Sequence, residues 1–133
     1  MGTTFAVARV TNPRIARAKG QDIEFLVDTG ALYSVLPASK LKKLRVRSLG
    51  DETFTLADGT HQTFAVGEAF FSVMGRGATS KVVFGPEEST PLLGALTLES
   101  LGLMVNPVTR EVKPMRLLLA GFSSGAMTFK TGG

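Results

Sequence analysis

The sequence contains no cysteine, one histidine and one tyrosine among its 133 residues. Without cysteine the chain forms neither disulfides nor thiolate metal sites, so nothing argues for an oxidising compartment, and we expect no metal and no cofactor. No apolar run approaches the length of a membrane span, and residues 1–6 lack the basic and then apolar pattern of a secretory signal peptide. We therefore expect a soluble, cytoplasmic protein that makes no membrane contact.

Length bounds the domain organisation. A chain of 133 residues is sufficient for one domain with its own hydrophobic core. We expect this domain at residues 1–120 and a flexible Gly/Ser-rich tail at residues 121–133.

Short apolar segments alternate with turn residues along the domain. Two early segments of this kind are Phe5–Thr11 and Ile23–Val27, and two later ones, Leu103–Val105 and Arg110–Val112, flank a turn and predict a hairpin. Convincing helical stretches are few. The pattern predicts an all-β domain that is closed into a barrel or rolled.

The net charge of the chain is +4, and five basic residues crowd into eight positions. They are Lys40, Lys42, Lys43, Arg45 and Arg47. Such a run could neutralise phosphates, but Pro37 followed by Leu41 and Leu44 is typical of a short surface helix whose polar face is solvated. The run contains no aromatic side chain that could stack on a base. We therefore expect no nucleic-acid partner.

The most informative segment is an apolar strand, Phe25–Val27, that runs directly into Asp28, Thr29 and Gly30. An unpaired carboxylate is costly to bury, so Asp28 needs either a partner or a chemical role. Gly30 allows a sharp turn and a close approach to another chain, and Thr29 supplies a hydroxyl that donates and accepts hydrogen bonds. Ala31 keeps the space beside the carboxylate small.

The run Asp28–Ala31, with Ser34–Pro37 behind it, resembles the active-site loop of retropepsin-like aspartic proteases. A second element of that family is present at Pro91–Gly94, followed by a helix with Ala95, Leu98 and Leu101 on one face. Gly102 stands where a left-handed helix cap is expected. The resemblance covers about residues 7–119 and implies an all-β, retropepsin-like closed barrel with one short C-terminal helix.

Between these two elements lies a segment, residues 53–66, that resembles the hairpin flap with which the family covers its substrate. The resemblance implies that Leu56, Ala57, Asp58 and Gly59 bind substrate from the flap, together with Ala31 and Leu93. Phe54, Leu56, Phe64 and Val66 are expected to line the flap and to favour apolar substrate residues. With Asp58 and a single glycine at its tip, the flap should be stiffer and more acidic than the glycine-rich retroviral flaps. The single histidine, His61, is expected to be exposed beside the tip.

The chain carries only one Asp-Thr-Gly motif, because Asp58, Gly59 and Thr60 have the wrong order and fit a hairpin turn. The second carboxylate must then come from a second copy of the chain, related by a twofold axis. Two carboxylates in contact share one proton, so one acts as base towards a water and the other as acid towards the peptide carbonyl. The resemblance implies that Asp28 is catalytic, that Thr29 bonds across the axis, and that Gly30 offers its N–H to the carboxylates.

Three function classes stay open at this point. The leading prediction is a homodimeric aspartic endopeptidase that hydrolyses an extended peptide or protein substrate without metal. The alternative is a catalytically silent retropepsin-like module for dimerisation or peptide binding, because fold alone does not determine function. A basic nucleic-acid module is the third.

Overall fold

The computed structural model describes residues 3–116, and in that part of the chain nine strands and two short helices follow one another. In chain order they are β1 (Phe5–Thr11), β2 (Gln21–Asp28), β3 (Ser34–Pro37), α1 (Ala38–Lys43), β4 (Gly50–Thr55), β5 (His61–Val73), β6 (Arg76–Gly85), β7 (Leu92–Gly94), α2 (Ala95–Leu101), β8 (Leu103–Val105) and β9 (Val112–Pro114). The tail expected at residues 121–133 lies outside the described residues.

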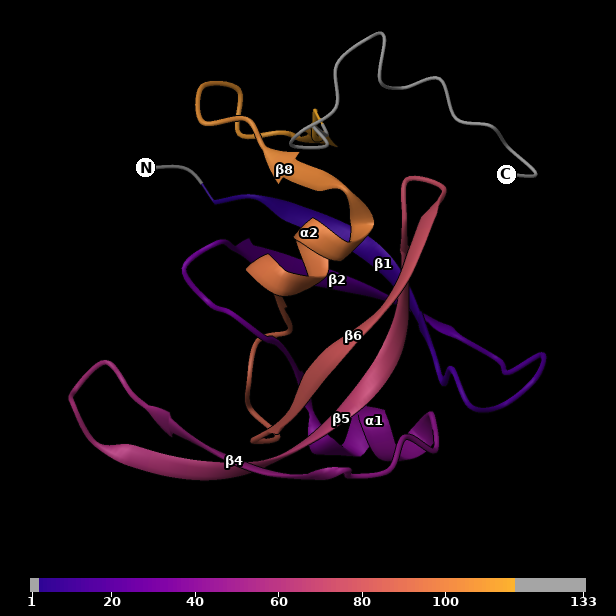
Figure 1. The fold of residues 1–133 in the computed structure, drawn as a ribbon, viewed down its shortest axis with the longest axis vertical. Helices are drawn as coiled ribbons and strands as arrows, with labels where there is room; N and C mark the ends of the chain where they lie inside the picture. The colour runs from indigo at the N-terminus through magenta and orange to yellow at the C-terminus, as the bar shows by residue number, and fades with distance from the viewer. Residues whose placement is uncertain (1–2, 117–133) are drawn as a thin grey trace, which may run out of the picture.

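Six strands close into a barrel in the order β1-β2-β7-β3-β6-β5, and β4 extends the sheet beyond β5. The closure is made by β5, which pairs with the end of β1 over Arg9–Thr11. Full closure leaves no open sheet edge along the paired segments. The predicted all-β, closed-barrel fold is confirmed, and Figure 1 shows β4 and the first part of β5 as a hairpin that extends beyond the barrel.

The core follows from the two-residue period of the strands. Along β2, Ile23, Phe25 and Val27 are buried while Glu24 between them is exposed. Phe25 meets Phe71 of β5 inside the barrel, edge to face, with ring centroids 6.0 Å apart. Such aromatic pairs stabilise a core beyond the area that they bury.

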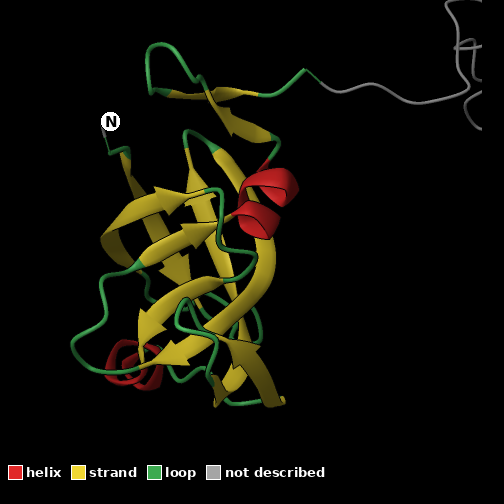
Figure 2. Ribbon diagram, turned by 90° about the vertical axis from the view of Figure 1, so that its left-hand side faces the viewer, coloured by secondary structure: helices red, strands yellow, loops and turns green. Residues whose placement is uncertain are grey.

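The predicted short surface helix is confirmed as α1. Its Leu41 is fully buried and Leu44 after it is 6 % exposed, while Lys42 and Lys43 face solvent. Figure 2 shows α1 and α2 at opposite ends of the barrel. The apolar side of each helix closes one end of the core.

The helix expected after Gly94 is also confirmed. α2 buries Thr97, Leu98 and Leu101, and it ends at Gly102 with a left-handed φ of 69°. Glycine adopts that conformation without the steric cost that a Cβ would add.

The hairpin β8–β9 is present, but its second strand is not where the sequence predicted it. Val105 pairs with Val112, so the strand begins at Val112 rather than at Arg110. The reason is a turn of its own around Asn106, whose Oδ1 accepts the N–H groups of Val108 and Thr109 at 2.8 and 3.1 Å. Asparagine side chains readily close turns in this way, and this turn lengthens the loop.

No helix within residues 3–116 is long and apolar enough to cross a membrane.

Candidate active site

Asp28 is the last residue of β2, and it is held in place by the strand β7 and by the residue that precedes β1. β2 pairs in parallel with β7, with Asp28 opposite Gly94, and the Val27 N–H donates to the Thr4 carbonyl at 2.8 Å. The Asp28 side chain is half-buried, and its Oδ1 accepts the Gly30 N–H at 2.9 Å. No donor within residues 3–116 bonds to its other oxygen, Oδ2. The carboxylate is therefore oriented by its own loop and keeps one oxygen available.

Gly30 is required for space rather than for an unusual backbone conformation. Its φ lies outside the left-handed region, although the predicted turn is present, with the Ala31 N–H donating to the Asp28 carbonyl at 3.2 Å. A Cβ at this position would lie 3.2 Å from Asp28 Oδ1, tighter than an ordinary van der Waals contact. Any side chain would crowd the carboxylate that the Gly30 N–H binds.

The loop is held from behind by the start of α2. The Ala95 N–H donates to the Ala31 carbonyl at 2.8 Å, and the Leu96 N–H donates to the Leu32 carbonyl at 3.0 Å. The first N–H groups of a helix have no partner within the helix, so the loop carbonyls satisfy them. This explains why α2 follows β7 directly, because together the strand and the helix fix the shape of the Asp28 loop.

The flap is the hairpin of β4 and β5. At its tip the Leu56 N–H donates to the Thr60 carbonyl at 2.7 Å, and Gly59 has a left-handed φ of 86°. Asp58 Oδ1 accepts the Thr60 hydroxyl at 2.6 Å and the Thr60 N–H at 2.9 Å. These two hydrogen bonds, the hydroxyl first, lower the pKa of Asp58, so this carboxylate stays ionised in mild acid.

A cavity of about 450 Å³ lies between the Asp28 loop and the flap. Its lining is mainly apolar and includes Ala31, Tyr33, Phe54, Leu56, Phe64 and Val83. A volume of this size accommodates a large side chain of a ligand.

The structure distributes the expected substrate-binding residues over three places. Ala31 and Leu56 line the cavity, while Ala57, Asp58 and Gly59 are exposed at the flap tip. Leu93 is fully buried in the core, so it supports the loop and does not contact substrate. Its assignment as a substrate contact is corrected, because Leu93 lies opposite Val27 on β2 and, like Val27, faces the barrel interior.

The model of the aspartyl protease family matches residues 15–97, more than half of the chain. The chain belongs to this family. The matched segment contains the Asp28 loop, the flap and the β7 strand of this aspartyl protease. No curated protein matches its sequence.

Solved viral proteases share the fold. EIAV protease complexed with the inhibitor HBY-793 superposes with a TM-score of 0.59 at 18% identity, over 89% of this chain and 94% of that one. Simian Foamy Virus (mac) protease, a solution structure, gives a TM-score of 0.53 at 19% identity, over 72% of this chain and 92% of that one. The expected retropepsin-like fold of this aspartyl protease is confirmed.

Tyr33 is a cavity residue of the protease that the sequence did not single out. Its ring meets Phe54 edge to face at 5.8 Å, and its hydroxyl donates to Glu52 at 3.4 Å. Lys81 lies 3.2 Å from the same Glu52 carboxylate, which is the main cause of its raised pKa. Tyr33 thereby ties the flap base to the Asp28 loop. The sequence offered only a general indication, because the hydroxyl of a buried tyrosine usually has a hydrogen-bond partner.

Three buried hydroxyls behind the protease loop were also missed. Thr97 Oγ1 of α2 lies 2.6 Å from Ser34 Oγ and 2.9 Å from Ser80 Oγ, and Ser34 Oγ also accepts the Gly94 N–H at 3.0 Å. Ser34 and Thr97 are fully buried. The network joins β3, β6 and α2 behind the Asp28 loop. The only indication of this network in the sequence was the presence of polar residues at inward-facing positions of otherwise apolar elements.

Replacing Thr97 with valine keeps the side-chain shape but removes the shared partner of two serines. A buried hydroxyl that loses its hydrogen bond costs about 1–3 kcal/mol, and we expect a loss of that size in the free energy of unfolding. Urea denaturation followed by circular dichroism measures it. Ser100→Ala is the matched control, because Ser100 lies on the same helix but is exposed. Equal stability of the two variants would contradict the role assigned to the network.

One carboxylate is all that the single chain offers at this site. Within residues 3–116, no group of three or more histidine, aspartate or glutamate side chains is placed to hold a metal ion. A lone carboxylate can take a proton from water, but acid–base hydrolysis of an amide also needs a group that gives a proton.

Proposed function

We propose that this aspartyl protease is a homodimeric endopeptidase in which the Asp28 carboxylates of two copies form one catalytic pair. The observation that carries the proposal is the single Asp-Thr-Gly loop, which is rigidly held from behind and presents one carboxylate. A twofold axis beside the loop brings each residue next to its own copy. The second Asp28 then supplies the missing group.

The surface around the loop supports such an axis. Thr29 and Gly30 are exposed, and the Thr29 hydroxyl has no hydrogen-bond partner in the part of the chain that the structure describes. The adjacent Leu32 is 61% exposed. Covering a large exposed apolar side chain and an unpaired hydroxyl with a second copy of the chain favours association, because the apolar surface then leaves water. Thr29 then bonds across the axis and fixes the two loops relative to each other.

In the dimer the two carboxylates share one proton, because two like charges in contact cannot both persist. The ionised Asp28 takes a proton from a bound water, whose oxygen attacks the carbonyl carbon of the scissile peptide. The protonated Asp28 gives its proton to the carbonyl oxygen, which yields a tetrahedral diol. Return of a proton to the nitrogen breaks the C–N bond and releases an amine and a carboxylic acid.

The cavity between the Asp28 loop and the flap favours an extended peptide with an apolar side chain beside the scissile bond. The flap strands can pair with such a peptide as with an added strand, and alternate side chains then enter pockets. Phe54, Phe64 and Val83 give the cavity its apolar wall. The ionised Asp58 at the flap tip disfavours substrates that carry acidic residues at that position.

Dilution tests the proposal directly. A site shared between two copies is lost when they dissociate, so specific activity should fall with the dimer fraction as the protein is diluted. Cleavage of a fluorogenic apolar peptide gives the activity, and sedimentation velocity at the same concentrations gives the dimer fraction. A monomer with full specific activity would refute the shared site.

A further inference from the structure

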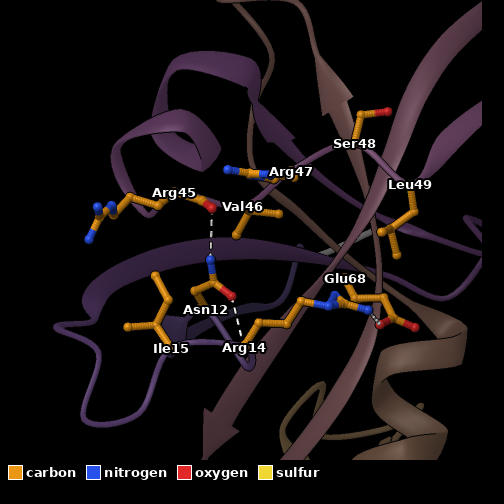
Figure 3. A pocket seen from close by; sticks show the side chains of 9 residues that line it. All are labelled: Asn12, Arg14, Ile15, Arg45, Val46, Arg47, Ser48, Leu49 and Glu68. Atoms are coloured by element: carbon orange, nitrogen blue, oxygen red, sulfur yellow. Dashed lines mark hydrogen bonds and ion pairs between the residues drawn. The ribbon is translucent and has the colours of Figure 1, made fainter.

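A second cavity, of about 580 Å³, lies at the other end of the barrel from Asp28. It sits between the turn after β1 and the loop after α1, and we name it the arginine hollow after Arg14, Arg45 and Arg47 in its lining (Figure 3). Gln21, at the start of β2, pairs with Val10 near the end of β1, and at the usual strand rise it lies about 23 Å from Asp28 at the other end of β2. The arginine hollow is therefore distinct from the cavity between the Asp28 loop and the flap.

The backbone of the arginine hollow is firmly held. Asn12, only 7% exposed, donates to the carbonyls of Leu44 and Arg45 at 3.3 and 2.8 Å, and its Oδ1 accepts the Arg14 N–H at 2.9 Å. α1 ends in a Schellman motif, with the Val46 N–H bonded to the Leu41 carbonyl at 3.0 Å. The walls are thus preorganised before any ligand arrives, which lowers the entropic cost of binding.

The charge of the arginine hollow is unbalanced. Arg14 makes an ion pair with Glu68 at 3.2 Å, and Figure 3 shows its side chain directed towards that carboxylate. Arg45 and Arg47 are exposed and form no ion pair with any residue of the described chain. Two guanidinium groups on one short loop therefore lack a counter-charge, and guanidinium groups bind carboxylates strongly and often with two parallel hydrogen bonds.

The lining also has an apolar part. Ile15 and Leu49 contribute side chains to it, and Leu49 is 56% exposed. A phosphate backbone gains nothing from such apolar surface. No aromatic side chain lines the hollow to stack on a base. A ligand whose acidic side chains alternate with apolar ones matches both the charged and the apolar part of the lining.

We propose that the arginine hollow binds an acidic, partly apolar peptide segment. Carboxylates of the segment bond to Arg45 and Arg47, and its apolar side chains pack on Ile15 and Leu49. Binding here requires neither hydrolysis nor the second copy of the chain, so it goes beyond the proposed function and stands independently of it.

The test is the affinity of the full-length protein for a fluorescein-labelled decapeptide of alternating glutamate and leucine, measured by fluorescence anisotropy. The variant Arg45→Gly/Arg47→Gln removes both unpaired charges. Arg45 has a left-handed φ of 63°, which glycine adopts more readily, so the fold is retained. Loss of two charge-assisted hydrogen bonds should weaken binding by about tenfold or more.

Arg17→Gly/Lys19→Gln is the matched control. It also removes two exposed charges two positions apart, and Arg17 has a similar left-handed φ of 55°, but neither residue lines the arginine hollow. We expect a change of less than about twofold, as for surface charges remote from a ligand. Equal losses in both variants, or no peptide binding by the unaltered protein, would overturn the proposal. Tighter binding of a labelled ten-nucleotide thymidine strand than of the peptide would also overturn it in favour of a nucleic-acid surface.

Discussion

Replacing Asp28 with asparagine should abolish peptide cleavage and leave both the fold and the dimer intact. The asparagine side chain has the same shape, and its Oδ1 can still accept the Gly30 N–H that now binds the carboxylate at 2.9 Å. An amide cannot take a proton from water, however, and it cannot share one with its copy. Because the base and the acid are lost together, kcat should fall by about 10³-fold or more.

The measurement is kcat on an apolar fluorogenic peptide, with sedimentation velocity to confirm the dimer. Asp22→Asn is the matched control, since Asp22 lies on the same strand β2, is exposed, and pairs only with the surface residue Arg9 at 3.0 Å. It should keep kcat within about twofold, as expected for an exposed ion pair. An active Asp28→Asn variant would rule out the catalytic pair. A folded, unaltered dimer that cleaves no peptide between acid and neutral pH would favour the silent binding module.

The parts of this fold that the sequence predicted are those with local causes. The alternation around Phe25 placed β2, and the left-handed cap at Gly102 placed the end of α2. The turn at Gly59 placed the flap hairpin. Each of these depends on a few neighbouring residues, whose backbone preferences are visible in the sequence itself.

The parts that it did not predict are contacts between distant segments. The hydroxyl of Ser34 meets Thr97, 63 positions away, and Tyr33 meets Lys81 across 48 positions. Local pattern carries no information on which polar residue a closed barrel brings opposite another. The burial of Leu93 had the same origin, because only the pairing of β7 beside β2 shows which side of that short strand faces inward.

The arginine hollow illustrates the limit in another way. The basic run from Lys40 to Arg47 was predicted as a short surface helix with a solvated polar face, and the helix is present but ends at Lys43. No pattern in the sequence indicated that Arg14 would join these residues. That contact depends on Asn12, whose amide bridges the turn after β1 and the end of α1. A charge cluster becomes a site only when tertiary hydrogen bonds hold its members around a common space.

The second large effect is expected at Gly94, the residue opposite Asp28 on β7. Its φ of −88° is accessible to any residue, so glycine is not required there for its conformational freedom. The requirement is steric, because a Cβ would lie 2.7 Å from the Tyr33 carbonyl carbon and oxygen and 2.8 Å from the Leu32 carbonyl oxygen. All three are backbone atoms, which cannot rotate away as the end of a flexible side chain can.

Gly94→Ala should therefore force the Asp28 loop away from β7. The shift would break the Gly94 N–H bond to Ser34 and the Leu96 N–H bond to the Leu32 carbonyl. We expect a loss of about 3 kcal/mol in the free energy of unfolding, as for severe overpacking of a core. Peptide cleavage should be lost even where the variant stays folded, since the carboxylate no longer sits in its loop geometry.

Urea denaturation and kcat/KM on the same preparations separate the two effects. Gly75→Ala is the control, because Gly75 occupies an exposed turn with open space around it and a left-handed φ of 76°. Its cost is conformational only, about 1 kcal/mol, and kcat/KM of the folded protein should not change. A Gly94→Ala protein that is as stable and as active as the Gly75→Ala control would show that β7 does not hold the loop. The close approach of the two backbones at Gly94 would then have no part in building the site.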